Sequence, residues 1–245
     1  MQAWLITLLL VLPSAAEVCN PADVHGVYGF QLSGTTTISS RPQPVVSVGR
    51  LVFDTDHSVS GISSTDFTGL YLGNPVRGMY QVSADCSISW SLQDDSGHDQ
   101  QFRGTVSSDG RRVQFQQTDP GSPHRGVMLQ AAESCRESDF QSSYHMAISG
   151  KLVDVATAQT SGDLSLDGSI ERRGSGLSIT AGGATTTGSV EVDDDCFVHL
   201  NLKLPQENGG AREMNFRGML VDGGKQVLGM ATDPGTAVSL RLDAR

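Results

Sequence analysis

Lysine is almost missing from this 245-residue chain, which contains only Lys151, Lys203 and Lys225. Lysine and arginine together number 17 against 27 acidic residues, so the formal net charge is −10. No run of basic residues occurs anywhere. Nucleic acids and anionic membrane surfaces are bound through clustered positive charge. The composition therefore predicts no nucleic-acid partner and no binding to an anionic membrane surface.

Long apolar runs are missing as well. The longest lies at residues 5–12, inside the uncharged N-terminal stretch MQAWLITLLLVLPSAA, and a membrane-spanning helix needs about 20 apolar residues. Pro13 ends this run, and Ser14, Ala15 and Ala16 supply the small residues that signal peptidase prefers. We therefore expect residues 1–16 to be a signal peptide, no transmembrane segment to follow, and the protein to be secreted or periplasmic.

Recognisable catalytic motifs are also absent. The chain contains no Gly-x-Ser-x-Gly elbow, no His-Glu-x-x-His and no phosphate-binding Gly-x-x-x-x-Gly-Lys. The acidic turn Asp54-Thr55-Asp56 begins like a calcium loop but lacks the later glycine and glutamate. The sequence thus predicts no cofactor, no metal and no identifiable catalytic residue, and it leans against an enzyme.

Internal repetition is what the chain does contain. Four blocks of the first half recur in the same order in the second half, at separations between 110 and 116 residues. The matched pairs are 28–34 with 144–150, 49–54 with 162–167, 78–93 with 188–203, and 101–121 with 215–235. Such repetition predicts a tandem duplication. We expect a first domain at residues 17–131 and a second at residues 132–245.

The matched blocks alternate apolar and polar residues with a period of two. Ile88, Trp90 and Leu92 share one face of a run whose other residues are polar, and this pattern is typical of half-buried antiparallel strands. The first half contains about eight such runs, near 27–34, 46–54, 58–68, 77–84, 87–94, 99–107, 111–118 and 124–130. Eight short strands favour closure, because a closed sheet has no exposed edge. The predicted fold is all-β, with two tandem eight-stranded antiparallel barrels; two β-sandwiches are the alternative.

The tetrapeptide Thr-Asp-Pro-Gly ends a strand in each half, at 118–121 and 232–235. Proline followed by glycine suits the two central positions of a type II turn. A structural role as a turn is therefore favoured over a catalytic role for this tetrapeptide. Arg103 and Arg217 also occur at matched positions, and we expect them to form ion pairs with Asp119 and Asp233.

Four cysteines form two equivalent sets, and four cysteines allow three pairings. Cys19 precedes Tyr28 by nine residues as Cys135 precedes Tyr144, and Cys86 and Cys196 each follow an aspartate in a matched block. Repetition selects the disulfides Cys19–Cys86 and Cys135–Cys196. A zinc site is the alternative, but Cys-x-x-Cys spacing is missing. The six histidines never fall at matched positions, so we expect surface or strand residues rather than ligands or bases.

The segments GVYGFQLSG, GRLVFD, GMYQVSADCSISWSLQD and QQTDPG resemble motifs of exported, uncharacterised bacterial proteins with one or two barrels. The barrel that this resemblance implies is similar to those of allene oxide cyclases and dirigent proteins, with eight antiparallel strands around an apolar interior. The match covers nearly all of the first half. No catalytic residue of the plant enzymes is identifiable here.

Three functions are compatible with these observations. The first is a non-enzymatic protein that binds a small apolar ligand, with Tyr28, Tyr80 and Trp90 among the residues lining the site; the alternative for these three is a filled core. The second is a structural or adhesive component of the cell envelope. The third, from the barrel resemblance alone, is an isomerase- or cyclase-like enzyme. An open cavity with convergent polar groups would separate the second function from the other two.

Overall fold

The computed structural model describes residues 19–245 except 21–23, 39–40, 68–69, 175 and 207–208. The expected signal peptide, residues 1–16, lies outside the described residues. The first eight strands are β1 (Gly26–Ile38), β2 (Arg41–Phe53), β3 (Ser58–Phe67), β4 (Leu70–Val82), β5 (Ser87–Asp94), β6 (Asp99–Val106), β7 (Arg112–Gln117) and β8 (Arg125–Gln130). After a short 3₁₀ helix, η2 (Glu137–Asp139), come β9 (Ser143–Asp154), β10 (Gln159–Arg173), β11 (Gly176–Ala181), β12 (Ala184–Val192), β13 (Phe197–Pro205), β14 (Ala211–Val221), β15 (Gln226–Ala231) and β16 (Thr236–Ala244).

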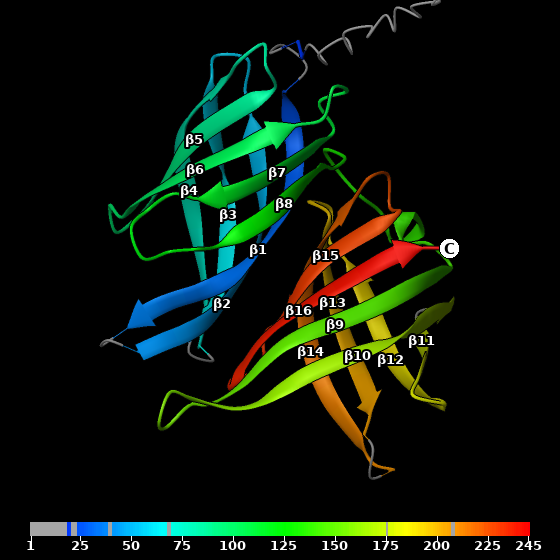
Figure 1. Ribbon diagram of the computed structural model, residues 1–245. Coiled ribbons are helices and arrows are strands. Elements are labelled where there is room, and N and C mark those ends of the chain that lie inside the picture. The colour runs from blue at the N-terminus through cyan, green and yellow to red at the C-terminus, as the bar shows by residue number, and fades with distance from the viewer. Residues whose placement is uncertain (1–18, 21–23, 39–40, 68–69, 175, 207–208) are drawn as a thin grey trace, which may run out of the picture.

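Both sets of eight strands close into antiparallel barrels (Figure 1). In the first barrel β1 pairs with both β2 and β8. In the second, β9 pairs with both β10 and β16. Each sheet therefore returns to its first strand, as a barrel requires and a sandwich does not. The predicted all-β barrel fold is confirmed. No helix in the described part of the chain combines the length and the apolar character needed to cross a bilayer.

Equivalent contacts recur in the two barrels. Disulfides join Cys19 to Cys86 and Cys135 to Cys196, the pairing that the equivalence of the cysteines selects. Each barrel also anchors a buried tyrosine to a turn: the Tyr28 hydroxyl donates to the Gly110 carbonyl at 2.7 Å, and the Tyr144 hydroxyl donates to the Gly224 carbonyl at 2.6 Å. These bonds satisfy hydroxyls that burial removes from water.

Strand register corrects one of the predicted matches. Tyr28 of β1 pairs with Leu51 of β2, whereas Tyr144 of β9 pairs with Ile170 of β10. The position of Leu51 is therefore that of Ile170, and the match of residues 49–54 with 162–167 is wrong by six residues. β10 is long and alternates along most of its length, so the apolar period alone could not distinguish one register from another shifted by an even number of residues.

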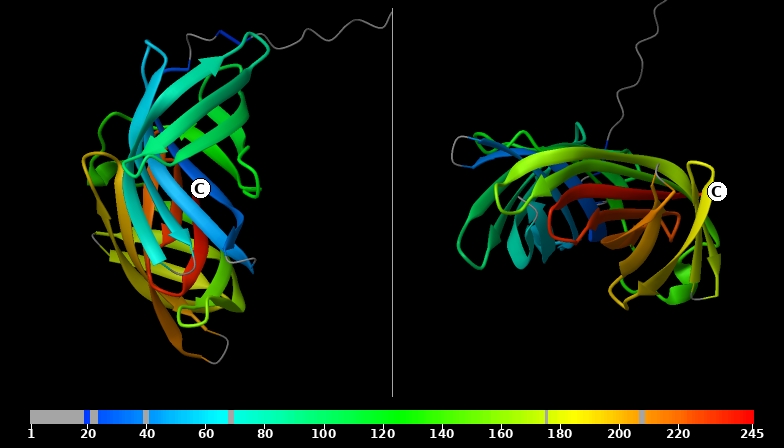
Figure 2. Two further views of the ribbon diagram at one scale, coloured as in Figure 1. Left: turned by 90° about the vertical axis from the view of Figure 1, so that its left-hand side faces the viewer. Right: turned by 90° about the horizontal axis from the view of Figure 1, so that it is seen from below.

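The two barrels pack against each other through their outer walls (Figures 1 and 2). β2 lies against β14, β15 and β16. Its outward residues Val46 and Val48 are buried in one cluster with Val153, Met230 and Ala237 of the second barrel. The Gln31 side chain of β1 donates to the carbonyls of Gly229 at 2.6 Å and Leu240 at 3.0 Å. The Gln43 side chain of β2 also crosses the interface, where its Nε2 donates to the Ala158 carbonyl at 2.8 Å while its Oε1 is buried without a partner among the described residues. The interface is thus apolar at its centre, with amide hydrogen bonds beside it.

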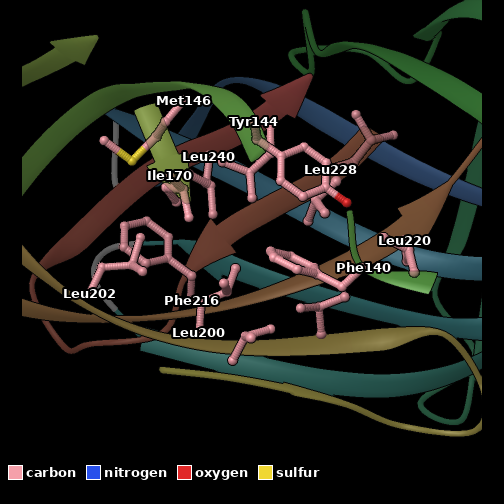
Figure 3. Packing of buried hydrophobic residues seen from close by; sticks show 14 of the residues in the cluster. Phe140, Tyr144, Met146, Ile170, Leu200, Leu202, Phe216, Leu220, Leu228 and Leu240 are labelled. Atoms are coloured by element: carbon pink, nitrogen blue, oxygen red, sulfur yellow. The ribbon is translucent and has the colours of Figure 1, made fainter. Parts of the chain in front are cut away.

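The interior of the second barrel is filled by apolar side chains (Figure 3). Leu200, Leu202 and Phe216 meet Met146 and Ile170, and each is at most 2% exposed. Burial of large aliphatic and aromatic side chains contributes roughly 1.5–3 kcal/mol each. The inward positions of this barrel therefore serve stability.

The Thr-Asp-Pro-Gly segments are turns in both barrels. The Ser122 N–H donates to the Asp119 carbonyl, and Gly121 and Gly235 have φ values of +78° and +80°. The Asp119 carboxylate accepts from the Gln101 N–H at 2.9 Å, as Asp233 accepts from the Asn215 N–H at 2.7 Å. Each aspartate thus ties its turn to a neighbouring strand. The six ion pairs of the described residues include neither Arg103 nor Arg217, so the predicted Arg–Asp pairs are wrong.

The two turn glycines differ in surroundings, which gives a first prediction. A β-carbon at Gly121 meets no atom within 4 Å, whereas one at Gly235 lies 2.8 Å from the Val153 carbonyl oxygen. We expect Gly121→Val to lower the free energy of unfolding by about 1–3 kcal/mol through strain at positive φ, and Gly235→Val to lower it further. Denaturant unfolding of both variants measures the difference. Equal losses would mean that the backbone at Val153 moves aside freely.

Candidate functional site

The first barrel contains a cavity of about 470 Å³, which is in the usual size range of small-molecule sites. Its lining includes exposed residues beside the hairpin ends, such as Leu72, Asn74 and Ser96. The mouth therefore lies at the end of the barrel where β1–β2, β3–β4 and β5–β6 turn. The disulfide Cys19–Cys86 lies at the opposite end.

The opposite end is closed by a cluster of aromatic rings. The Phe53 ring meets the Tyr28 ring at 5.4 Å and the Tyr80 ring at 4.9 Å, both edge to face. The Tyr80 hydroxyl donates to the carbonyls of Val24 at 3.0 Å and Asp54 at 2.9 Å. Burial, with a smaller contribution from the Asp54 carboxylate, raises the pKa of Tyr80. Tyr28 and Tyr80 therefore plug the closed end and are not among the residues that line the cavity.

Aromatic and aliphatic side chains form the floor of the cavity. Trp90, the third residue predicted from the sequence, lines it together with Phe30, Leu51, Phe102 and Phe115. The Trp90 ring stacks on Phe102 at 5.1 Å and 12° and meets Phe115 edge-on at 5.1 Å. Trp90 is only 3% exposed, and its indole N–H has no hydrogen-bond partner among the described residues. A buried donor without a partner costs stability.

Polar side chains surround the upper part of the cavity. Ser47 and Thr65 share a hydrogen bond of 2.9 Å across β2 and β3, and both line the cavity. Gln100, Gln117 and His124 line it from β6, β7 and the loop before β8. The cavity thus combines an apolar floor with hydrogen-bonding groups nearer its mouth.

His124 is held by a short chain of hydrogen bonds. The Gln117 side-chain amide donates to the Asp119 carboxylate at 2.8 Å, which directs the amide oxygen toward His124 Nδ1 at 2.6 Å. An amide oxygen can only accept, so the proton is assigned to Nδ1 in the neutral ring. Burial lowers the pKa of His124, with the Thr35 backbone and the Asp119 carboxylate opposing it. The expectation that the histidines lie on the surface or serve as ordinary strand residues is wrong for His124, which is 6% exposed.

Asp94 is the one carboxylate among the described lining residues, which include no lysine or arginine. Its Oδ1 accepts hydrogen bonds from the Ser96 hydroxyl at 2.6 Å, the Ser96 N–H at 2.9 Å and the His98 N–H at 3.1 Å. These bonds, the Ser96 hydroxyl first, lower the pKa of Asp94. The carboxylate is therefore ionised at neutral pH. Among the described residues no group of three or more histidines, cysteines or carboxylates could hold a metal ion.

Equivalent positions of the second barrel carry apolar side chains. In the first barrel Leu92 pairs with Gln100, and in the second Leu202 pairs with Met214. A β-carbon at Gly34 would meet His124, and one at Gly150 would meet Val238. By the same register, the positions of Asp94, Gln100, Gln117 and His124 in the first barrel belong to Leu204, Met214, Ala231 and Val238 in the second. The polar character of the first interior is thus a local difference between two similar scaffolds.

Sequence reasoning missed these polar lining residues, although a signal was present. Gln100 and Gln117 have the inward phase of their strands yet are polar, while Met214 and Ala231 at the matched positions are apolar. A comparison of inward positions between the two halves would have identified the first barrel as the one with polar residues in its interior.

Comparison with known proteins gives little further guidance. No model of a known protein family matches the chain, and no curated protein matches it. Among solved structures, isotype 1 transferrin-binding protein B from serogroup B Neisseria meningitidis matches over 92% of this chain and 77% of its own, with 8% identity and a TM-score of 0.32. A protein of unknown function from the DUF3598 family of Nostoc punctiforme matches over 90% and 94%, with 8% identity and a TM-score of 0.26. Neither is an allene oxide cyclase or a dirigent protein, and the resemblance to those barrels is not confirmed. Similarities this low transfer no binding property to the present chain.

Proposed function

We propose that this protein binds a small, largely apolar ligand in the cavity of its first barrel, and that its second barrel is a filled support. The observation that supports this proposal is the contrast between the interiors of the two barrels. Equivalent inward positions are polar around an open cavity in one barrel and apolar in a packed core in the other. If stability alone had set these positions, large apolar residues would be expected in both.

The chemistry of the lining supports binding of this kind. Small-molecule sites are mostly apolar and have a few convergent polar groups. Here the aromatic floor around Trp90 supplies apolar area, while Gln100, Gln117 and the Ser47–Thr65 pair supply hydrogen bonds.

The proposal includes an origin and a location for the protein. A duplicated barrel, divided near residue 131, would have kept its scaffold contacts in both copies and its cavity in one. Export after removal of residues 1–16 agrees with two disulfides, which form and persist in oxidising compartments. The cleaved chain, residues 17–245, is the form to test.

Filling the cavity tests the function. The second barrel carries Leu152 and Leu166 where the first has Thr36 and Ser47, so Thr36→Leu with Ser47→Leu copies a packing already used by this chain. We expect the wild type to bind the neutral probe N-phenyl-1-naphthylamine, seen as enhanced probe fluorescence, and the double variant to bind it at least tenfold more weakly. Thr35→Leu, at an exposed neighbouring position, is the matched control and should bind like the wild type.

Two results would overturn the proposal. One is a wild type that takes up no probe. The other is a filled variant that is folded, as circular dichroism and thermal unfolding establish, and that still binds with wild-type affinity. A loss in the Thr35→Leu control equal to that of the double variant would likewise place the probe outside the cavity.

A further inference from the structure

We infer that the ligand of the first barrel is an organic cation, an amine or quaternary ammonium compound whose apolar ring system occupies the aromatic floor. This inference rests on the proposed function and specifies the charge of the molecule bound. It is carried by the position and the surroundings of Asp94.

Asp94 lies at the inward phase of its strand. The buried residues of β5 are Ile88, Trp90 and Leu92, and Asp94 follows at the next inward position, where it lines the cavity. Its counterpart in the second barrel, Leu204, is 2% exposed inside the core. A carboxylate therefore stands at a position that the same scaffold elsewhere gives to a core leucine.

The carboxylate has one oxygen engaged and one available. All three hydrogen bonds from the β5–β6 turn go to Oδ1, and Oδ2 accepts none from the described residues. No lysine or arginine of the described lining balances the negative charge. The lining also includes His98 and His124, and Asp94 is the only carboxylate among its described residues. An anionic ligand, such as a fatty acid, would thus meet like charge and no lysine or arginine, whereas a cation would be attracted.

The spacing along β5 sets the length of the ligand. Trp90 and Asp94 are four residues apart, which corresponds to about 13 Å along a strand at roughly 3.3 Å per residue. An ammonium group beside Asp94 would therefore belong to a molecule whose ring system begins one or two bonds away and extends toward Trp90. Aromatic walls from Phe30, Phe102 and Phe115 offer ring faces and edges against which such a ring system can pack.

A matched series of ligands separates charge from apolar contact. We would titrate the cleaved chain by calorimetry with 1-naphthylmethylammonium, 1-naphthylmethanol and 1-naphthylacetate, which share one ring system and differ in head-group charge. The cation is expected to bind at least tenfold more tightly than the anion, with the alcohol between them. Asp94→Asn should reduce the affinity for the cation five- to tenfold and leave the alcohol unchanged, because asparagine keeps an acceptor for the turn.

Asp95→Asn is the control, since Asp95 is an exposed neighbour whose replacement changes the net charge equally. It should leave all three affinities unchanged. Equal binding of cation and anion, or equal effects of Asp94→Asn and Asp95→Asn, would overturn the inference while the proposed function stands. Failure of all three compounds to bind would count against the proposed function itself.

Discussion

Replacing Cys135 and Cys196 by serine is expected to lower the free energy of unfolding by about 4 kcal/mol. The bond closes a separation of 61 residues, and its removal enlarges the conformational entropy of the unfolded chain. The Cys19–Cys86 bond closes 67 residues, so removing it should cost nearly the same. Guanidinium unfolding of both double variants measures the two losses.

Reduction provides an independent check on this result. Wild-type protein in reductant should unfold at the denaturant midpoint of a variant lacking both disulfides. The two double-serine variants must also retain the β-sheet circular dichroism spectrum of the wild type without denaturant, so that folded protein is compared in each case. A loss below about 1 kcal/mol for either double variant would contradict the entropic argument, because loops of this length should give several times that value.

Val48→Asp should lower the free energy of unfolding at neutral pH by about 4 kcal/mol or more, because a fully buried carboxyl can have its pKa raised by about 3 units or more. Val48 is 0% exposed and lies in the cluster between the two barrels. The introduced carboxyl has a higher pKa folded than unfolded, so the loss grows as the pH rises above about 4 and is relieved below it. Thermal unfolding between pH 3 and pH 8 follows this dependence.

Ile62→Asp is the matched control for Val48→Asp. Ile62 is on the neighbouring strand β3 and is 39% exposed, so its replacement should change stability by no more than about 0.5 kcal/mol. If Val48→Asp were as mild as Ile62→Asp at neutral pH, the two barrels would not be tightly packed in solution.

The barrel fold could be predicted because its signal is repeated along the chain. Alternation with a period of two identifies strands, and eight of them without helical segments favour closure. The extent of β1 and β2 was harder to predict. Their shared hairpin reaches Ile38 and Arg41, beyond the expected strands, through Thr35–Thr37 and two prolines at 42 and 44. That stretch lacks alternation and contains residues that strands usually disfavour, and it pairs because the hairpin runs along the second barrel.

The candidate site was predicted only in part. Trp90 lines the cavity, but Tyr28 and Tyr80 have the same inward phase and lie at the closed end. Phase tells which face of a strand a residue occupies and does not tell its height along the barrel axis, which depends on strand tilt and register. The site residue His124 comes from the loop before β8, in which no periodic pattern applies. The hydrophobic period of a sequence encodes neither the height of a residue along the barrel axis nor the geometry of a turn.

β15 occupies a special place in this architecture. Five of its six residues are buried, because one face points into the filled second barrel while Met230 on the other belongs to the cluster shared with the first barrel. Its amide protons can reach solvent only when both contacts are lost, so their deuterium exchange should report the cooperative opening of the whole molecule. Amides of β3 and β4 beside the cavity have fewer buried neighbours and should exchange through smaller local openings. We therefore expect a rigid centre joined to a cavity wall that opens more readily.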